Sequence, residues 1–453
     1  MPVNSVRKEK LVALGVYQLA DALLELASYV DAADDLVERM IATPQGNIKR
    51  FTDKLSDLKQ GHRFIDWREN AGFAREIETL LDDLRAGVTD PRTGVELVAS
   101  FYEADSAIFE NCDDSSGAIG DVFRHDACKL FVGYASCCAD KEWLGDLVFR
   151  VIQSDGYGVR DVLIESALEY LSEAVIRAMV ARMQEKAGQA SDDYHKREWL
   201  RHVESLARQL KDAPLFEQTR LASRGELSTA ACLDIARVHL QCGNEQTAIT
   251  WLEKIPESDT FKTAERDDLL FEIHGRTGNR AGRAEVAWRI FRRSRNAASL
   301  ALLLNAIGND QRSDVLASEV AAIHESIGFS LVDAVFLVEI EKLEEAESYL
   351  MNHRDQLNGD YYGGLLPLVE VMEENGRILC ASVIYRALLD SILRRGQTKS
   401  YSHGARYLRK LDLLAHSISD WHAVIPHDAY LQDIKLNHGR KSSFWSQYGS
   451  RVG

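Results

Sequence analysis

One segment gathers the polar side chains that could most readily bind a ligand. Residues 109–126 read FENCDDSSGAIGDVFRHD and place carboxylates, hydroxyls and glycines between two apolar helical patterns. Carboxylate and hydroxyl oxygens suit a hard cation, whereas glycine-rich turns expose backbone N–H groups to an anion. The candidate binding corner in this segment comprises Asp113, Asp114, Ser115, Ser116, Gly117, Gly120, Arg124 and His125.

The spacing in this corner excludes two familiar sites. A calcium loop of the EF-hand type needs glycine at position 6 and glutamate at position 12. A loop that starts at Asn111 has Ser116 and Val122 at these positions. A loop that starts at Asp113 has Arg124 at the last one. A phosphate loop needs a Gly-Lys-Ser/Thr ending, which this segment lacks.

What remains is the chemistry of a helix terminus. Ser115 or Ser116 can cap the following helix, and Gly117 and Gly120 leave its first N–H groups uncovered. Such a terminus can hold an anion, although the nearby aspartates would repel one and can themselves satisfy the helix dipole. A structural turn is the favoured interpretation, a corner that binds a partner or ligand is the alternative, and no catalytic residue is assigned.

Cysteine and histidine spacing does not predict a metal site. His125 and Cys128 share a helix face at i, i+3, but the adjacent Cys137 and Cys138 point in different directions on a helix. Well-attested zinc sites use paired C-x2-C or H-x3-H arms. The chain has 7 cysteines, an odd number without disulfide-like spacing, so reduced thiols in a cytosol are expected.

Two local basic stretches stand out on an acidic chain. Residues 276–295 contain a run of arginines countered by Glu285 alone, and residues 435–451 read KLNHGRKSSFWSQYGSR, which interleaves basic and aromatic side chains. The first is favoured as a helix face that pairs with acidic neighbours, and the second as a last helix whose aromatics dock on the preceding ones. The alternative for the first is a face that binds an acidic partner or nucleic acid, and the alternative for the second is nucleic-acid binding. The candidate basic surface comprises Arg289, Arg292, Arg293, His438, Arg440 and Lys441.

Composition predicts an all-α protein. Only 7 of 453 residues are proline, and Ala, Leu, Glu and Arg dominate long stretches. Asp90-Pro91 is typical of a helix start, and leucines from Leu11 to Leu26 predict a first helix with one face in a core. The net charge of −16 argues against a general nucleic-acid or acidic-membrane binder. No apolar run is long enough to span a bilayer, so a cytoplasmic protein without a membrane partner is expected. No cofactor is predicted.

The second half repeats. Gly-Asn recurs at residues 243–244, 278–279 and 308–309, at intervals of 35 and 30 residues, each time between helical patterns. Ala236, Gly243 and Ala248 occupy small-residue positions of a tetratricopeptide-type helix pair, and Asn375-Gly376 divides a similar later unit. Because such pairs cannot bury their faces alone, they must stack. We therefore expect a tetratricopeptide-like helical-repeat superhelix after an N-terminal helical domain.

Polar, small residues suggest where the segments divide. The stretch KAGQASDD at residues 186–193 lies between two strong helical patterns. The predicted division is an N-terminal helical domain at 1–188, tetratricopeptide-like repeats at 189–395, and capping helices with the basic, aromatic tail at 396–453.

Five short blocks, in this order, resemble a bacterial family of all-helical proteins that carries a domain of unknown function. The blocks are RFIDWRE (63–69), CDDSSGAIGDVFR (112–124), IYRALLD (384–390), SYSHGARYLRKL (400–411) and HGRKSSFW (438–445). The resemblance implies an all-helical, repeat-rich bacterial protein without an established activity. The tail is also similar to helical ends of some zinc-finger proteins of the SWIM type, but the C-x-C pair of that finger is absent, so no zinc site is carried over.

These observations favour a non-catalytic scaffold or adaptor that binds a protein or peptide in a bacterial cytoplasm. The alternative is an enzyme or ligand-binding domain centred on Asp113, Asp114, Arg124 and His125. A third hypothesis is nucleic-acid binding through the arginines and the tail. Signatures of Ser-His-Asp hydrolases, HExxH metalloproteases and dinucleotide-binding folds are missing from the sequence.

Overall fold

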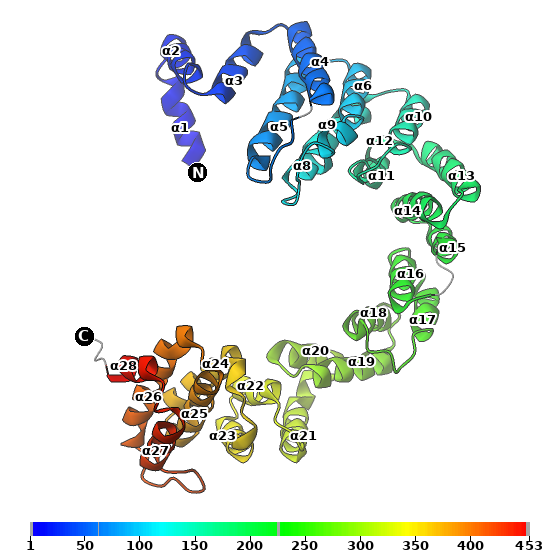
Figure 1. Ribbon diagram of the computed structural model, residues 1–453. Helices are drawn as coiled ribbons and strands as arrows, with labels where there is room; N and C mark the ends of the chain where they lie inside the picture. The colour runs from blue at the N-terminus through cyan, green and yellow to red at the C-terminus, as the bar shows by residue number, and fades with distance from the viewer. Residues whose placement is uncertain (1–2, 62, 224–226, 450–453) are drawn as a thin grey trace. The chain divides into compact units, whose positions relative to one another are not determined.

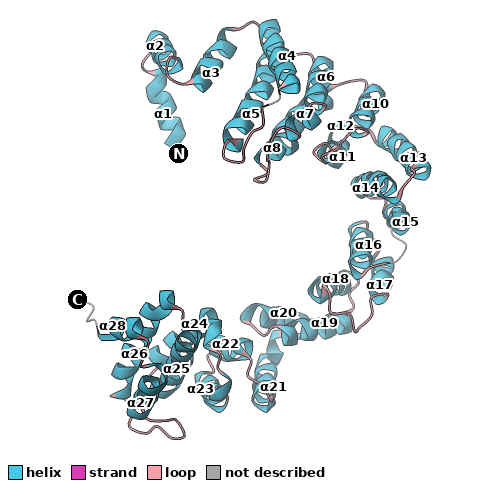
Figure 2. Cartoon of the chain, viewed as in Figure 1, coloured by secondary structure: helices cyan, strands magenta, loops and turns pink. Residues whose placement is uncertain are grey.

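The computed structural model describes residues 3–61, 63–223 and 227–449 and confirms the all-α prediction. Within these ranges every regular element is a helix (Figure 2), and extended pairing is limited to one isolated parallel bridge between Ile65 and Cys112. The chain divides into two compact units, unit 1 at Met1–Ile255 and unit 2 at Pro256–Gly453.

Unit 1 contains helices α1 to α17, of which all but α7 are labelled in Figure 1 and α7 in Figure 2. Their bounds are α1 Val3–Val12, α2 Val16–Ala27, α3 Asp31–Ile41, α4 Pro44–Gln60, α5 Asn70–Gly87, α6 Pro91–Tyr102, α7 Asp105–Phe109, α8 Ala118–Asp121, the π-helix η1 Val122–Ala127, α9 Cys128–Cys137, α10 Lys141–Ile152, α11 Asp161–Glu165, α12 Ala167–Tyr170, α13 Glu173–Gln189, α14 Asp193–Gln209, α15 Ala213–Ser223, α16 Thr229–Gln241 and α17 Glu245–Glu253.

Unit 2 contains the helices labelled α18 to α28. Their bounds are α18 Thr263–Arg276, α19 Arg280–Arg293, α20 Ala297–Ile307, the 3-10 turn η2 Asn309–Gln311, α21 Arg312–Glu325, α22 Leu331–Glu339, α23 Leu343–Asn352, the 3-10 turns η3 Arg354–Gln356 and η4 Gly359–Tyr361, α24 Tyr362–Glu374, α25 Ile378–Arg395, the 3-10 turn η5 Thr398–Ser400, α26 Tyr401–Ala415, α27 His427–His438 and α28 Ser442–Gly449.

Sequence neighbours pack against each other, which makes the fold an all-α helical repeat. The closest packing joins consecutive helices such as α4 with α5, α13 with α14, α16 with α17 and α25 with α26. Local signals set the boundaries: the Asp90 carboxylate accepts a hydrogen bond from the Thr93 N–H at 2.8 Å, and Pro91 opens α6 as predicted. The first N–H groups of a helix have no carbonyl acceptor within it, and here the Asp90 side chain supplies an acceptor at the start of α6.

The predicted glycine turns separate helices as expected. Gly243, Gly278 and Gly376 have φ of 79°, 69° and 72°, and they end α16, α18 and α24 respectively. A residue with a Cβ is strained in this left-handed conformation, so glycine ends the helix at little cost. The turns of these three helix pairs are therefore where the sequence predicted them.

Each unit has its own apolar core. In unit 1 the core runs from Phe51 on α4 to Leu206 on α14, and in unit 2 it runs from Ala287 on α19 to Phe444 on α28. Unit 1 also buries an ion pair, in which Arg160 Nη2 lies 2.6 Å from Asp105 Oδ1 and both side chains are almost fully inaccessible.

The N-terminal prediction is wrong in one respect. The leucines of the first predicted helix do not share a core face, because the chain breaks into α1 and α2 at Gly15, which has a φ of 85°. Leu11, Leu14 and Leu26 are each about half exposed, at 51%, 52% and 50%. An amphipathic pattern gives a helix an apolar face but does not supply a partner for it.

The compact units do not test the predicted division into three segments. Residues 186–193 form the end of α13, a short turn and the start of α14, and these two helices pack together within unit 1. The compact units divide at Ile255, so the boundaries after residues 188 and 395 stay a prediction. Among the described residues, no helix is both long enough and apolar enough to cross a bilayer.

Candidate functional site

The predicted corner at residues 113–125 is held together by its own backbone. Asp114 Oδ1 accepts a hydrogen bond from the Ile119 N–H at 3.0 Å, and Asp114 Oδ2 accepts one from the Gly120 N–H at 2.9 Å. Ser116 Oγ lies 3.4 Å from the Ala118 nitrogen, a longer contact. Asp114 is therefore the main cap of α8, because its carboxylate reaches two N–H groups at once, and the predicted Ser116 adds a longer hydrogen bond to a third.

Asp113 ties the corner to a distant segment. Its N–H donates to the Ile65 carbonyl at 3.0 Å, and its carbonyl accepts a hydrogen bond from the Asn70 side chain. Its carboxylate accepts the Ser115 N–H at 3.1 Å. Both aspartate side chains thus satisfy backbone groups of the turn, which leaves less of their charge for a ligand.

Arg124 and His125 follow in η1 and are both exposed. A Cβ on Gly120 would lie 2.7 Å from Arg124 Nη1, so the guanidinium folds back over this glycine. His125 Nε2 is 3.9 Å from Asp121 Oδ1 at the surface. The structure therefore brings the corner residues together as a capped helix junction, and a ligand there stays a prediction.

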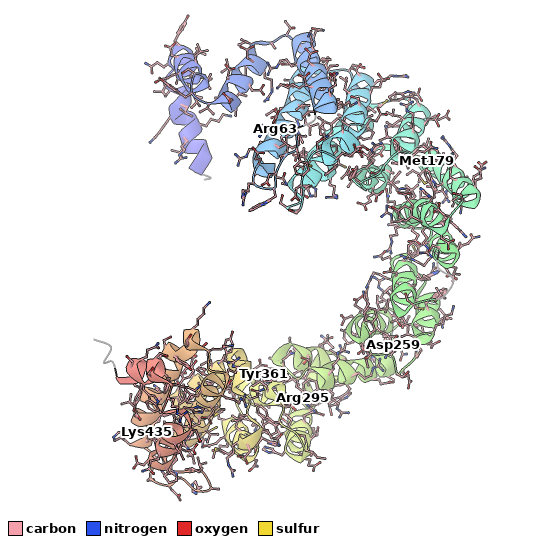
Figure 3. All side chains as sticks on the ribbon, viewed as in Figure 1. Arg63, Met179, Asp259, Arg295, Tyr361 and Lys435 are labelled. Atoms are coloured by element: carbon pink, nitrogen blue, oxygen red, sulfur yellow. The ribbon has the colours of Figure 1, made fainter. Side chains whose placement is uncertain are left out.

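The arginine stretch of unit 2 is paired with buried acids. Asp267, only 1% exposed, contacts Arg289 at 3.0 Å and also contacts Arg293. Glu319, also 1% exposed, contacts Arg292 at 3.1 Å. Arg295, labelled in Figure 3, extends the same series to Glu319 and Asp333. These pairs match the favoured interpretation of a helix face that pairs with acidic neighbours.

The aromatic tail docks on unit 2. Phe444 is fully buried, and its ring centroid lies 5.8 Å from that of Tyr401. Trp445 Nε1 donates to the His438 carbonyl at 3.0 Å, and the Tyr448 hydroxyl donates to Asp412 Oδ2 at 2.7 Å. Of the predicted basic surface, Arg440 is exposed, whereas His438 and Lys441 are half-buried. Residues 450–453 of the predicted tail lie outside the described residues.

The cysteines considered for a metal do not converge. Cys128 is buried with its Sγ 3.6 Å from Ser166 Oγ, and burial raises its pKa. Cys137 is exposed and Cys138 is buried, whereas His125 is exposed. Over the described ranges, no three His, Cys, Asp or Glu side chains gather closely enough to hold a metal ion.

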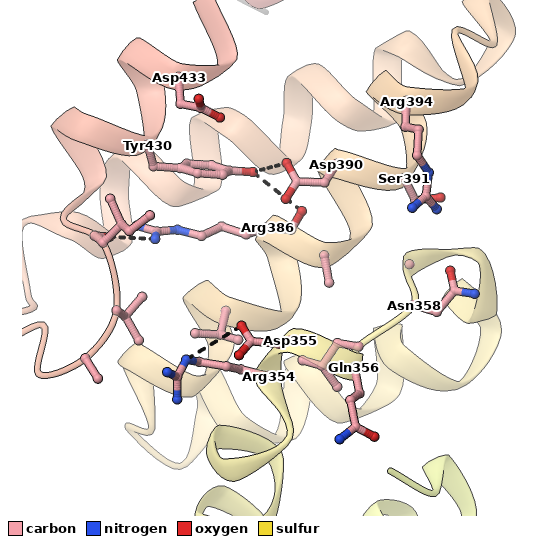
Figure 4. Close-up of a pocket in the computed structure, with 17 residues that line it drawn as sticks. Arg354, Asp355, Gln356, Asn358, Arg386, Asp390, Ser391, Arg394, Tyr430 and Asp433 are labelled. Carbon is pink, nitrogen blue, oxygen red and sulfur yellow. Dashed lines mark hydrogen bonds and ion pairs between the residues drawn. The ribbon is translucent and has the colours of Figure 1, made fainter. Parts of the chain in front are cut away.

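Unit 2 contains a pocket that the sequence analysis did not predict. It has a volume of about 740 Å³ and lies between α25, the turns η3 and η4, the loop at residues 423–425 and α27 (Figure 4). Its charged lining residues are Arg354, Asp355, Arg386, Asp390, Arg394 and Asp433. Cations and carboxylates therefore share one cavity.

Arg386 is the most deeply placed of these cations, at 7% exposure. Its Nη1 donates to the Ile425 carbonyl at 2.6 Å, and its guanidinium carbon lies 4.9 Å and 4.4 Å from the Trp421 and Tyr430 ring centroids. Its Nε and Nη2 have no hydrogen-bond partner among the described residues. Burial lowers its pKa, although an arginine stays charged at neutral pH.

Asp390 and Tyr430 complete the wall of the pocket. The Tyr430 hydroxyl donates to Asp390 Oδ1 at 2.7 Å, as Figure 4 shows. Desolvation raises the pKa of Asp390, and the hydrogen bond from Tyr430 and the charge of Arg386 oppose this rise. Burial, followed by the adjacent Asp390, raises the pKa of Tyr430 well above its ordinary value. The pocket thus presents a neutral phenol, a carboxyl group and a buried guanidinium.

The sequence of the chain matches one family model. A model of a family of unknown function, DUF6880, matches residues 2–225 and 191–447. The chain belongs to the DUF6880 family. No curated protein matches the chain. The family membership confirms the resemblance found in the sequence and brings no activity with it.

For this DUF6880 protein, one sequence signal could have located the pocket. Arg386 and Asp390 stand at i, i+4 within the IYRALLD block at residues 384–390, which the sequence pattern identifies only as part of a helix pair. A positive and a negative side chain one helical turn apart share a helix face. The loops that close the pocket come from residues 354–359 and 423–425, and local spacing does not reveal their approach.

Proposed function

We propose that this DUF6880 protein is a non-catalytic helical-repeat scaffold that binds a protein or peptide partner, part of which enters the pocket of unit 2. The observation that carries the proposal is Arg386, a buried cation with two N–H groups that lack an acceptor beside a cavity of about 740 Å³. An unsatisfied buried donor costs about 1–3 kcal/mol. A peptide carbonyl or carboxylate oxygen would remove this cost.

The mixed charge of the pocket favours a peptide over a nucleic acid. Arg354 and Arg394 stand among Asp355, Asp390 and Asp433 along the lining. Phosphate groups would meet these carboxylates unfavourably, whereas a peptide carries donors, acceptors and charges of both signs. The acidic corner at residues 113–114 is a weaker candidate for a different reason, because its carboxylates already accept backbone N–H groups.

The helix pairs support a tetratricopeptide-like architecture for this scaffold. Small residues at Ala236 and Ala248 are buried where α16 meets α17, and Gly243 turns the chain between them. Stacked pairs of this kind present inner helices to a partner. All seven cysteines are free thiols, which agrees with a reducing compartment such as a bacterial cytoplasm.

Selection from a random peptide display library against the full chain tests the proposal even while the natural partner is unidentified. We expect enriched peptides to bind the wild type, and Arg394→Glu at the pocket to weaken them about tenfold or more, roughly 1.4 kcal/mol. Arg312→Glu, an exposed arginine on α21 outside the pocket, is the matched control and should leave affinity unchanged. Equal binding by all three proteins would contradict a role for the pocket.

A further inference from the structure

The first three helices of unit 1 expose an unusually large apolar surface. The structure describes every residue of α2, and none of them is buried. Large apolar side chains with at least 40% exposure occur throughout this segment: Val6, Leu11, Val12, Leu14, Val16, Tyr17, Leu24, Leu26, Tyr29, Val30, Leu36, Met40 and Ile41. An exposed apolar surface of this extent on a folded chain marks an interaction site.

The attachment of α3 explains why its apolar side chains face outward. Arg39 Nε lies 2.8 Å from Asp83 Oδ1, and the Asp83 side chain is fully buried. Asp35 contacts Arg50 and Lys54 of α4, each at 2.6 Å. The charged side of α3 thus faces the rest of unit 1, and Met40 and Ile41 remain 65% and 70% exposed.

The charges on this surface are self-complementary. The described α1 side chains, all exposed, include Arg7, Lys8 and Lys10 with Glu9 as the only acid. The neighbouring helices are acidic, with exposed carboxylates at Asp21, Glu25, Asp31, Asp34 and Glu38. A two-fold arrangement that places α1 of one copy against α2 and α3 of another would join opposite charges twice and cover both apolar faces.

We propose that α1–α3 form the interface of a homodimer, with a second copy of this chain as the occupant of the apolar surface. An anionic membrane fits less well, because the carboxylates of α2 and α3 would meet lipid charges of the same sign. The proposal is independent of the pocket in unit 2, so either can fail alone.

Light scattering coupled to size-exclusion chromatography tests the dimer with the full chain. The wild type should have twice the monomer mass of 50.9 kDa at concentrations of about 100 µM. Leu24→Glu, on α2 at 59% exposure, should give the monomer mass with unchanged helical circular dichroism. Leu436→Glu, on α27 at 84% exposure, is the matched control and should remain dimeric.

Charge reversal tests the arrangement of the two copies. Arg7→Glu with Lys8→Glu makes α1 acidic, and Asp21→Lys with Glu25→Lys makes α2 more basic. Each double variant alone should be monomeric, because α1 and α2 then repel across the two-fold axis. An equimolar mixture of the two should recover the dimer mass, since an α1 of one variant then meets an α2 of opposite charge on the other.

Several results would overturn the proposal. A wild type that stays monomeric at about 100 µM would do so, as would dimers that persist in Leu24→Glu. A mixture of the two charge variants that stays monomeric would refute the pairing of α1 with α2. A monomeric wild type that sediments with phosphatidylglycerol vesicles, and loses this with Leu24→Glu, would assign the surface to a membrane.

Discussion

Helices α2 and α28 both carry apolar side chains, but those side chains are exposed in α2 and mostly covered in α28. At the C-terminal end, Phe444 of α28 is fully buried against unit 2. At the N-terminal end, Val16 and Tyr17 of α2 are 81% and 88% exposed. The difference lies in the neighbours: Gly404 of α26 has no side chain, and a Cβ there would lie 3.3 Å from the Phe444 ring. The close approach of α28 to α26 at this glycine covers the Phe444 ring, whereas no residue of α2 is buried.

Removal of Phe444 should have the largest effect on this comparison. Phe444→Ala deletes a fully buried ring and leaves a cavity, so we expect a loss of about 3–5 kcal/mol in the free energy of unfolding. Urea unfolding followed by circular dichroism measures the loss. Tyr17→Ala on α2 is the matched exposed control and should change the stability of the monomer by less than about 0.5 kcal/mol. Similar losses of unfolding free energy in both variants would refute the contrast between a buried Phe444 and an exposed Tyr17.

Asp83 should have the next largest effect, because it anchors α3 through charge. Asp83→Asn removes a buried negative charge that lies 2.8 Å from Arg39 and 3.0 Å from Lys54. The two cations then have only the more exposed Asp35 and Asp82 as partners. We expect a loss of about 3 kcal/mol in the unfolding free energy and faster hydrogen exchange in α3. Unchanged exchange in α3 would show that apolar contacts, rather than charges, hold it.

The hydroxyl of Tyr448 should contribute less to the docking of α28. Tyr448→Phe removes its hydrogen bond to Asp412 but keeps the ring, so the expected loss is about 1–2 kcal/mol. Burial, followed by Asp412, raises the pKa of this phenol to about 12, so the hydroxyl is protonated and able to donate at neutral pH. A loss as large as that of Phe444→Ala would place the hydrogen bond, not the ring, at the centre of the docking.

The smallest expected effect is the pH dependence of the free energy of unfolding that comes from Asp35 of α3. Burial opposes ionisation of Asp35, but Lys54, Arg50 and Arg39 outweigh it and lower its pKa below 3.8. Because the folded pKa is lowered, the stabilisation is present at neutral pH and is lost as the pH falls through the folded pKa. Asp35→Asn should therefore be about 1 kcal/mol less stable than the wild type at pH 7.

The same variant checks the sign of this dependence. The difference in unfolding free energy between wild type and Asp35→Asn should begin to shrink as the pH falls below about 4, where the carboxyl of the unfolded chain becomes neutral. It should reach zero only below the lower folded pKa, where the carboxyl is neutral in both states. A difference that is constant with pH would assign the effect to packing rather than to charge.

Local patterns in the sequence predicted the elements of this fold well. Helix starts and ends are set by backbone chemistry within a few residues. Examples are the capped start at Asp90-Pro91 and the glycine turns at Gly243 and Gly278. A structural turn at residues 113–125 is predictable for the same reason, although Asp114 contributes more to the cap than Ser116 does.

Features that depend on distant contacts could not be predicted. The pocket needs Arg386 of α25 to meet Ile425 and Tyr430, which lie beyond the next helix along the chain. The exposure of Met40 and Ile41 on α3 likewise depends on the charged attachment of this helix through Asp83, a residue of α5. Periodicity shows that a face is apolar, and only the tertiary contacts show whether anything covers it.

Hydrogen exchange measured on the full chain at low and high concentration tests the central contrast most directly. We expect amides of α2 to exchange quickly in dilute protein and to become protected at about 100 µM, whereas those of α28 are protected at both concentrations. Equal protection of α2 and α28 in dilute protein would mean that α2 is covered by its own chain and would refute the contrast between the two helices. Rapid exchange of α2 at both concentrations would contradict the second copy.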